Sequence, residues 1–211
     1  MAGMNYEKDP AAIYAASFAA IRAETDLAAL PPSLESVAVR LIHACGMTDL
    51  AADLKFSPDV ADAARAALAR GAPVLVDTEM TAHAVIRSRL PSACDLVCTL
   101  NDPSVPARAK ELGTTRSAAA LSLWRDRLEG AVVAIGNAPT ALFALLEMLD
   151  AGAPRPAAIL AFPVGFVGAV ESKAELAANP RGVPFLTLAG RRGGSAMAGA
   201  AVNALGAGER P

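Results

Sequence analysis

The chain has 211 residues, of which 54% are hydrophobic and 19% charged, and its formal net charge is −2. A chain of this length can bury a sizeable core, and this composition excludes an intrinsically disordered protein. The near-neutral charge offers no basis for nucleic-acid binding.

The sequence also argues against a membrane or secreted protein. No apolar run reaches the roughly 18 residues that a spanning helix needs. The polar, acidic start "MAGMNYEKDP" lacks the pattern of a secretory signal. The three cysteines, Cys45, Cys94 and Cys98, form no CxxC pair, so we expect neither a disulfide framework nor a zinc site. A reducing cytoplasm is the simplest location for such a protein.

Two helices are predicted ahead of the first clear strand. The first begins at "DPAAIYAASFAAIRAE", where Asp9 can cap the helix and Pro10 fits its first turn. Within it, Ser17 lies one turn after Tyr14. The second helix covers "PPSLESVAVRLIHACG" and is expected to end at Gly46.

The second helix carries His43, one of only two histidines in the chain. At 100° per residue, His43 points about 170° away from the centre of the apolar stripe. A packed core histidine is therefore disfavoured. Two readings stay open: a solvated surface residue, or an acid or base on a face that looks into a cleft or a subunit interface. The apolar stripe consists of Leu34, Val37, Ala38, Leu41, Ile42 and Cys45.

Short, almost continuously apolar runs follow, separated by longer helical segments that often end at glycine, as at Gly46, Gly71, Gly113 and Gly152. Apolar runs of this kind are typical of parallel strands covered on both faces. We predict an α/β fold over residues 1–211 as a single domain: a doubly wound, mostly parallel sheet flanked by helices, with the N-terminal helical pair attached. The predicted strands are Pro73–Asp77, Asp95–Leu100, Ala131–Gly136, Ala157–Pro163 and Pro184–Gly190.

Ligands of such sheets bind beyond the carboxyl ends of the strands, so the residues that follow each strand are candidates. Asn137 in "GNAPT", and Arg192 and Ser195 in "RRGGSAM", precede or open helices whose free N–H groups suit anions. These loops can equally be no more than tight turns. Arg116 opens a further helix, where a cation opposes the helix dipole. Either a bound anion or a nearby acid would explain that placement.

The sequence lacks the motifs of several common classes of enzyme and binding protein. There is no Walker sequence, no GxGxxG in the first βαβ unit, no GxSxG elbow and no cluster of metal-ligating residues. The sequence therefore indicates a site for an anionic ligand, without an obvious nucleophile, metal or redox cofactor.

Eight segments in this order resemble the precorrin-8X methylmutase (precorrin isomerase) family of corrin biosynthesis. The likeness covers roughly residues 6 to 205, and the ordered set is far more specific than any one segment. The segments are "AASFAAIRAE", "AVRLIHACGMTDL", "FSP", "VLVDTEM", "TRSAAAL", "VVAIGNAPTALFALLEMLDAG", "PVGFVGAVESK" and "RRGGSAMAGAAVNAL".

The resemblance implies an isomerase that shifts a methyl group from C-11 to C-12 of precorrin-8X, giving hydrogenobyrinic acid on the route to cobalamin. It implies a cytoplasmic homodimer without metal or cofactor, able to hand its product to the next enzyme. His43 matches the family's proton donor/acceptor. Ser17, Arg40 and Arg116 match substrate-pocket positions, and we add Tyr14, Asn137, Arg192 and Ser195 as candidate substrate-binding residues.

Three alternatives remain at this stage. One is a methylmutase that acts on the cobalt-containing substrate of the anaerobic route. The second is a non-catalytic corrinoid carrier, and the third is a nucleotide-dependent transferase, against which the missing phosphate-loop motif argues.

Overall fold

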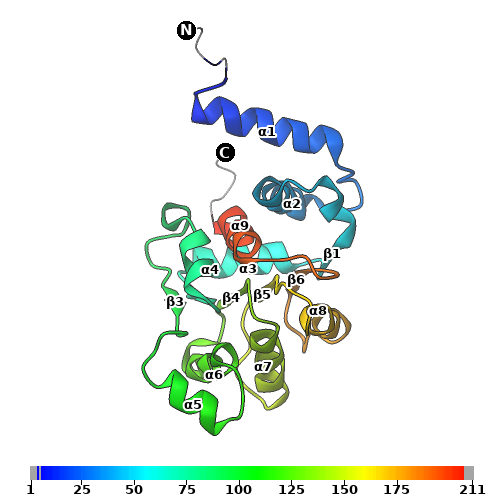
Figure 1. The fold of residues 1–211 in the computed structure, drawn as a ribbon. Helices are drawn as coiled ribbons and strands as arrows, with labels where there is room; N and C mark the ends of the chain where they lie inside the picture. Colours follow the sequence, from blue (N-terminus) through cyan, green and yellow to red (C-terminus); the bar gives the residue numbers. More distant parts are fainter. Residues whose placement is uncertain (1–3, 5, 207–211) are drawn as a thin grey trace.

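A six-stranded mixed sheet organises the chain in the computed structural model, which describes residues 4 and 6–206 (Figure 1). The strand order is β1-β6-β5-β4-β2-β3, and every neighbouring pair except β1–β6 is parallel. The strands are β1 (Leu54–Phe56), β2 (Val74–Val76), β3 (Leu96–Cys98), β4 (Val132–Ile135), β5 (Ala158–Ala161) and β6 (Phe185–Leu188). The five predicted strands and the α/β class are confirmed.

Strand β1 is absent from the prediction. It has only three residues and pairs antiparallel with β6 at the sheet edge, with Leu54 opposite Leu188. Its centre, Lys55, is exposed between Leu54 and Phe56, so it shows none of the continuous apolar character that marks the inner strands. The edge position explains this, because only one of its sides is paired and one face is open to water.

Helices cover both faces of the sheet (Figure 1). Val74 and Val76 of β2 point into one core and Leu75 into the other, as the alternation of side chains in a strand requires. On the first face lie α2 (Pro32–Cys45), α3 (Val60–Ala69), α4 (Glu79–Ala84) and α9 (Ser195–Gly206). On the second lie α5 (Val105–Glu111), α6 (Arg116–Leu121), α7 (Pro139–Asp150) and α8 (Ala169–Ala178). Short 3-10 helices complete the chain: η1 (Thr48–Asp53), η2 (Arg87–Arg89) and η3 (Ser122–Arg127).

Helix α1 (Pro10–Glu24) forms a further layer outside α2 (Figure 1). Its start is as predicted: the Asp9 side chain accepts a hydrogen bond from the Ala11 N–H, and Pro10 is the first helical residue. Only Ile21 is buried within α1. The helix therefore has one packed side and a largely exposed remainder.

The predicted helix-ending glycines all adopt left-handed backbone angles, with φ between 60° and 81°. Gly46 matters most for the site, because it ends α2 three residues after His43. Its N–H donates to the Ile42 carbonyl, and its φ of 71° is one that side-chain-bearing residues rarely adopt. The direction of the chain after His43 is thus set by this residue.

No helix in the described residues combines the length and the apolar character that crossing a membrane requires.

Candidate functional site

His43 lies between α2 and α1, half-buried. Its Nδ1 is 2.8 Å from the Ser17 hydroxyl. Its ring centroid is 5.2 Å from that of Tyr14 and 5.3 Å from that of Phe18, the latter edge-on at 84°. The prediction that His43 faces away from the core stripe is confirmed, and the face it occupies is covered by α1 instead of being fully solvated.

The spacing of Tyr14, Ser17 and Phe18 accounts for these contacts. Residues three and four apart share one face of a helix, so the three side chains of α1 point together at α2. Val39 and Arg40 of α2 are covered in the same way, with exposures of 1% and 9%. Helix α1 thus builds a second, more polar interior on the far side of α2.

The Ser17 hydrogen bond defines what the imidazole can do. When the hydroxyl donates to Nδ1, the neutral ring carries its proton on Nε2, where it can be given to a ligand. When the ring is protonated, Nδ1–H donates to the same hydroxyl. Ser17 can therefore hold the ring in place through both protonation states.

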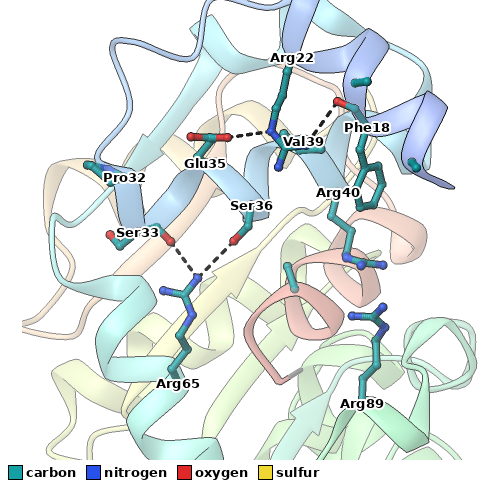
Figure 2. Close-up of a pocket in the computed structure, with 13 residues that line it drawn as sticks. Phe18, Arg22, Pro32, Ser33, Glu35, Ser36, Val39, Arg40, Arg65 and Arg89 are labelled. Atoms are coloured by element: carbon teal, nitrogen blue, oxygen red, sulfur yellow. Dashed lines mark hydrogen bonds and ion pairs between the residues drawn. The ribbon is translucent and has the colours of Figure 1, made fainter. Parts of the chain in front are cut away.

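A cavity of about 790 Å³ opens beside this pair, between α1, α2, α3 and the end of α9 (Figure 2). This is within the range of about 300–1,000 Å³ typical of small-molecule sites. Phe18 lines the cavity and also contacts His43, so one ring separates the imidazole from the cavity. The charged lining consists of Arg22, Arg40, Arg65, Arg89 and Glu35.

Arg22 and Arg65 are held by neighbouring groups of the protein. Arg22 forms an ion pair with Glu35 at 2.9 Å. Arg65 donates to the Ser33 carbonyl at 2.9 Å and to the Ser36 hydroxyl at 3.3 Å. Their guanidinium groups therefore connect the helices that form the cavity, Arg22 linking α1 to α2 and Arg65 linking α3 to α2.

Arg40 is in a different situation. Its guanidinium lies over the Phe18 ring, 5.3 Å from the centroid. Within residues 4 and 6–206 it has neither a hydrogen-bond acceptor nor an acidic partner. Burial lowers the pKa of Arg40, and the positive charge of Arg89 lowers it further. A buried cation of this kind, lining a cavity, favours an anionic ligand.

The loop that follows β4 does not offer the expected anion site. The Asp77 carboxylate accepts hydrogen bonds from the N–H groups of Gly136 (2.9 Å), Asn137 (2.9 Å) and Ala138 (3.0 Å). The prediction that these N–H groups await a ligand is wrong, because a carboxylate of the chain already occupies the start of α7. The Asn137 side chain itself is exposed.

Ser195 belongs to the same buried network. Its hydroxyl lies 2.9 Å from that of Thr81 and 3.4 Å from that of Thr78, and Thr81 in turn donates to Asp77. With 6% exposure, Ser195 is directed into the interior and away from the arginine-lined cavity. A substrate contact by this hydroxyl therefore has no geometric support in the free chain.

Arg192 is also paired internally. It contacts Asp49 at 2.9 Å and Asp53, and these hydrogen bonds raise its pKa. The pairs fasten the loop after β6 to η1, directly beyond the end of α2. Lys173, which is fully buried, donates to the Arg192 carbonyl at 2.6 Å and supports the same loop. Arg192 therefore has a structural role, holding this loop in place, that needs no substrate.

Arg116 lies far from His43 in the fold. It opens α6, is exposed, and donates to the Leu100 carbonyl (3.2 Å) and the Asn101 side chain (3.1 Å). These two oxygen acceptors, and not an acidic side chain, stabilise the positive charge of Arg116 at the N-terminus of the helix. Helices α6 and α2 cover opposite faces of the sheet (Figure 1), so one chain does not bring Arg116 and His43 to a common ligand.

Sequence reasoning missed Phe18, Arg65 and Arg89 as parts of the site. A signal existed for Phe18, which is one residue from Ser17 and one turn from Tyr14. The two arginines had none, because α3 and η2 reach the cavity only through the folding of the sheet. Among the described residues, no three histidine, cysteine or acidic side chains gather in a way that could hold a metal ion.

Together these observations define a doubly wound α/β protein with a serine–histidine pair beside an arginine-lined cavity. The family model described as precorrin-8X methylmutase matches residues 12–207. The chain belongs to the precorrin-8X methylmutase family.

Individual relatives agree with this assignment. Precorrin-8X methylmutase of Pseudomonas aeruginosa is 65% identical over 96% of this chain and 97% of its own length. The protein of that name from a Sinorhizobium species is 59% identical over 95% and 96%. Cobalt-precorrin-8 methylmutase of Priestia megaterium is 36% identical over 79% and 73%. Among solved structures, precorrin-8X methylmutase from Thermus thermophilus superposes with a TM-score of 0.84 at 38% identity, covering 92% of this chain and 94% of that one.

Proposed function

We propose that this protein is an isomerase of cobalamin biosynthesis that moves a methyl group from C-11 to C-12 of precorrin-8X and so produces hydrogenobyrinic acid. The observation that carries the proposal is the near full-length match at 65% identity to a precorrin-8X methylmutase. The arginine-rich cavity supports it, because the tetrapyrrole carries many carboxylates. The metal-free substrate is favoured over the cobalt form, since a relative named for the cobalt form, that of Priestia megaterium, shares 36% identity.

In this proposal His43 is the proton donor and acceptor. It protonates, or donates a hydrogen bond to, the macrocycle near the migrating methyl, and thereby favours the tautomer in which migration is downhill. The product has the same atoms as the substrate, so the proton given at the start returns to the imidazole. Ser17 orients the ring through the 2.8 Å contact at Nδ1, and Tyr14 packs on it. Arg40 binds a substrate carboxylate.

A homodimer is part of the same proposal. His43 and Arg116 cover opposite faces of one sheet, so a second copy is the simplest source of an Arg116 beside His43. Exposed apolar surface on α1 supports an interface, because Ile13 and Tyr14 are 46% and 43% exposed. A cytoplasmic dimer that passes its product to the next enzyme follows from the family resemblance.

Turnover tests the proposed function directly. Purified protein is incubated with a large molar excess of metal-free precorrin-8X while the absorption spectrum is followed. We expect conversion of many equivalents to the corrin product without added metal or nucleotide. A spectral change that stops at one equivalent per site would identify a carrier, and conversion of the cobalt form alone would reassign the substrate.

Replacing Ser17 with alanine is expected to lower kcat roughly tenfold, since one hydrogen bond to a group that becomes charged contributes about 1.5–3 kcal/mol at most. Ala16, the exposed neighbour of Ser17 on α1, offers a matched site for comparison as Ala16→Ser. Equal rates for Ser17→Ala and wild type at every pH would remove Ser17 from the mechanism.

Mixed dimers test the shared site. The His43→Ala and Arg116→Ala homodimers are both expected to have low activity. When the two variants are mixed and allowed to exchange subunits, about half of the dimers are heterodimers, and one of the two sites in each heterodimer is intact. The mixture should therefore recover about a quarter of the wild-type activity per site. Size-exclusion chromatography with light scattering measures the assembly. A monomeric mass, or no recovery in verified heterodimers, would contradict the proposal.

A further inference from the structure

The loop that follows β5, residues 164–168, presents apolar side chains to solvent, and we call it the apolar loop. Phe166 is 84% and Val167 88% exposed, and of the large apolar side chains that the structure describes only Met4 is more exposed. Single exposed apolar residues are common on protein surfaces, but two adjacent ones at the tip of one loop form a patch. Such a patch indicates a surface that a ligand or a partner covers.

The apolar loop is held in place by the rest of the chain. The Val164 N–H donates to the Asn137 carbonyl at 3.3 Å, and the Gly165 N–H donates to the Arg191 carbonyl at 3.2 Å. At the other end of the loop Gly168 has a φ of 79°, and a side chain there would crowd the start of α7. The exposed tip is therefore presented by a fixed turn, which reduces the entropy lost when a ligand binds.

Positive charges lie on both sides of the apolar loop along the sheet. In the strand order β6-β5-β4-β2-β3, Arg191 follows β6, the apolar loop follows β5, and Arg116 reaches the residues that follow β3. The Arg191 guanidinium lies over the Phe166 ring, 5.2 Å from its centroid. Since neighbouring strands are about 4.8 Å apart, roughly 14 Å separate β5 from β3. All three groups lie at the carboxyl edge of the sheet, where open α/β proteins bind ligands.

The segments that begin at this edge connect these groups into one surface. The hydroxyl groups of Thr115, directly before α6, and Thr140, in the first turn of α7, are 2.8 Å apart. Helix α7 in turn packs between α6 and α8 (Figure 1). On the other side of the apolar loop, Arg192 pairs with Asp49 beyond the end of α2. The surface therefore runs from the start of α6 to the segment that follows His43.

This combination of groups matches a broad ring with acidic groups at its rim. Apolar side chains can pack on the face of such a ring. A guanidinium at its edge can bind a carboxylate through two parallel N–H donors. A purely apolar partner surface would instead remove the Arg191 guanidinium from water without offering it an acid.

We infer that the apolar loop and Arg191 form a substrate-binding surface, in which Phe166 and Val167 pack on the tetrapyrrole ring and Arg191 binds one of its peripheral carboxylates. The identity of this ligand rests on the proposed function. The surface is separate from the arginine-lined cavity, since none of its residues lines that cavity. It holds the macrocycle and takes no part in the proton transfer, so it determines affinity more than the rate of the chemical step.

The experiment measures binding of hydrogenobyrinic acid and steady-state kinetics for Phe166→Ser and Arg191→Gln. For Phe166→Ser we expect Kd and KM to rise about 10- to 100-fold, the effect of losing one buried aromatic side chain, with kcat within about threefold of wild type. Phe166→Leu should lose less affinity, because it keeps an apolar side chain. Arg191→Gln should raise Kd about tenfold, as for a lost charged hydrogen bond.

Two variants outside this surface serve as matched controls. Leu112, at the end of α5, is 59% exposed, and Arg70, at the end of α3, is also exposed. Leu112→Ser and Arg70→Gln should keep the Kd of wild type. If Phe166→Ser binds as tightly as Leu112→Ser, the apolar loop is not a binding surface. Circular dichroism melting confirms that each variant is folded.

Salt dependence and assembly mass separate the possible occupants. Binding to wild type should weaken as salt rises, since salt screens charge pairs. This dependence should be smaller for Arg191→Gln and unchanged for Phe166→Ser. Light scattering gives the mass of each variant. A Phe166→Ser protein that forms a smaller assembly than wild type would show that the apolar loop contacts a second copy of the chain, and would overturn the inference.

Binding and turnover fail independently, which separates this inference from the proposed function. Wild type that binds hydrogenobyrinic acid through Phe166 but converts no precorrin-8X would overturn the proposed function and leave the binding surface intact. Wild type that converts its substrate while Phe166→Ser and Arg191→Gln match their controls would overturn the binding surface alone. Wild type that neither binds nor converts would overturn both.

Discussion

Replacing His43 with alanine is expected to lower kcat by about 10²- to 10⁴-fold, the usual contribution of a positioned general acid or base. The substrate should still bind, because Arg40 and the cavity are unchanged, so KM should move by much less than kcat. The measurement is the initial rate of the spectral change from precorrin-8X to the corrin product, in single turnover and at steady state.

His83, the other histidine in the chain, provides a matched control. It is exposed on α4, and its Nδ1 lies 2.7 Å from the Glu79 carbonyl, away from the arginine-lined cavity. His83→Ala should retain wild-type rates. If His43→Ala keeps near wild-type turnover while Arg116→Ala abolishes it, the assignment of the acid–base role to His43 is wrong.

Replacing Asp77 with alanine is expected to lower the free energy of unfolding by about 3–5 kcal/mol. The carboxylate, which is 1% exposed, accepts from three backbone N–H groups at the start of α7 and from the Thr81 hydroxyl. Alanine would leave several buried donors without acceptors, each costing about 1–3 kcal/mol before relaxation and entry of water. Since domains of this size are stable by about 5–15 kcal/mol, the variant should unfold at clearly lower urea concentration.

Two further variants sharpen that result. Asp77→Asn keeps one acceptor oxygen and should lose less stability than Asp77→Ala. Asp126 is an exposed acid in η3, and Asp126→Ala should stay within about 0.5 kcal/mol of wild type. An Asp77→Ala protein as stable as Asp126→Ala would show that solvent can replace the carboxylate at no cost. The Asp77 network would then no longer explain the order of the α7 loop.

The inner strands can be predicted from the sequence because a strand that is buried on both faces consists of a continuous apolar run, as in Val132–Ile135. The helix ends can be predicted for a similar local reason. The residue after a helix often adopts a left-handed backbone conformation, which glycine adopts most easily, and Gly46 is an example. Strand β1 could not be predicted, because three residues at a sheet edge show neither a continuous apolar run nor a helix-ending glycine.

The loops at the strand ends show where local reasoning fails. Glycines and a helix N-terminus predict a place for a bound anion, but at α7 a carboxylate of the chain itself occupies that place. Which anion occupies it depends on Asp77, which is about 60 residues away in sequence and adjacent only across β2 and β4. For the same reason Arg192 has internal partners, Asp49 and Asp53, that no spacing rule could identify.

The sequence by itself determined the α/β class, the inner strands, the helix ends, the family and the direction in which His43 leaves its own helix, because each is encoded in neighbouring residues or in ordered motifs. Only the tertiary structure decided what His43 meets on that side. The packing of α1 on α2 places Ser17 at its Nδ1, and the folding of α3 and η2 around the sheet brings Arg65 and Arg89 to the cavity with Arg40. Contacts between distant elements depend on the relative placement of whole helices, and that placement is set by the two cores together and by no single segment.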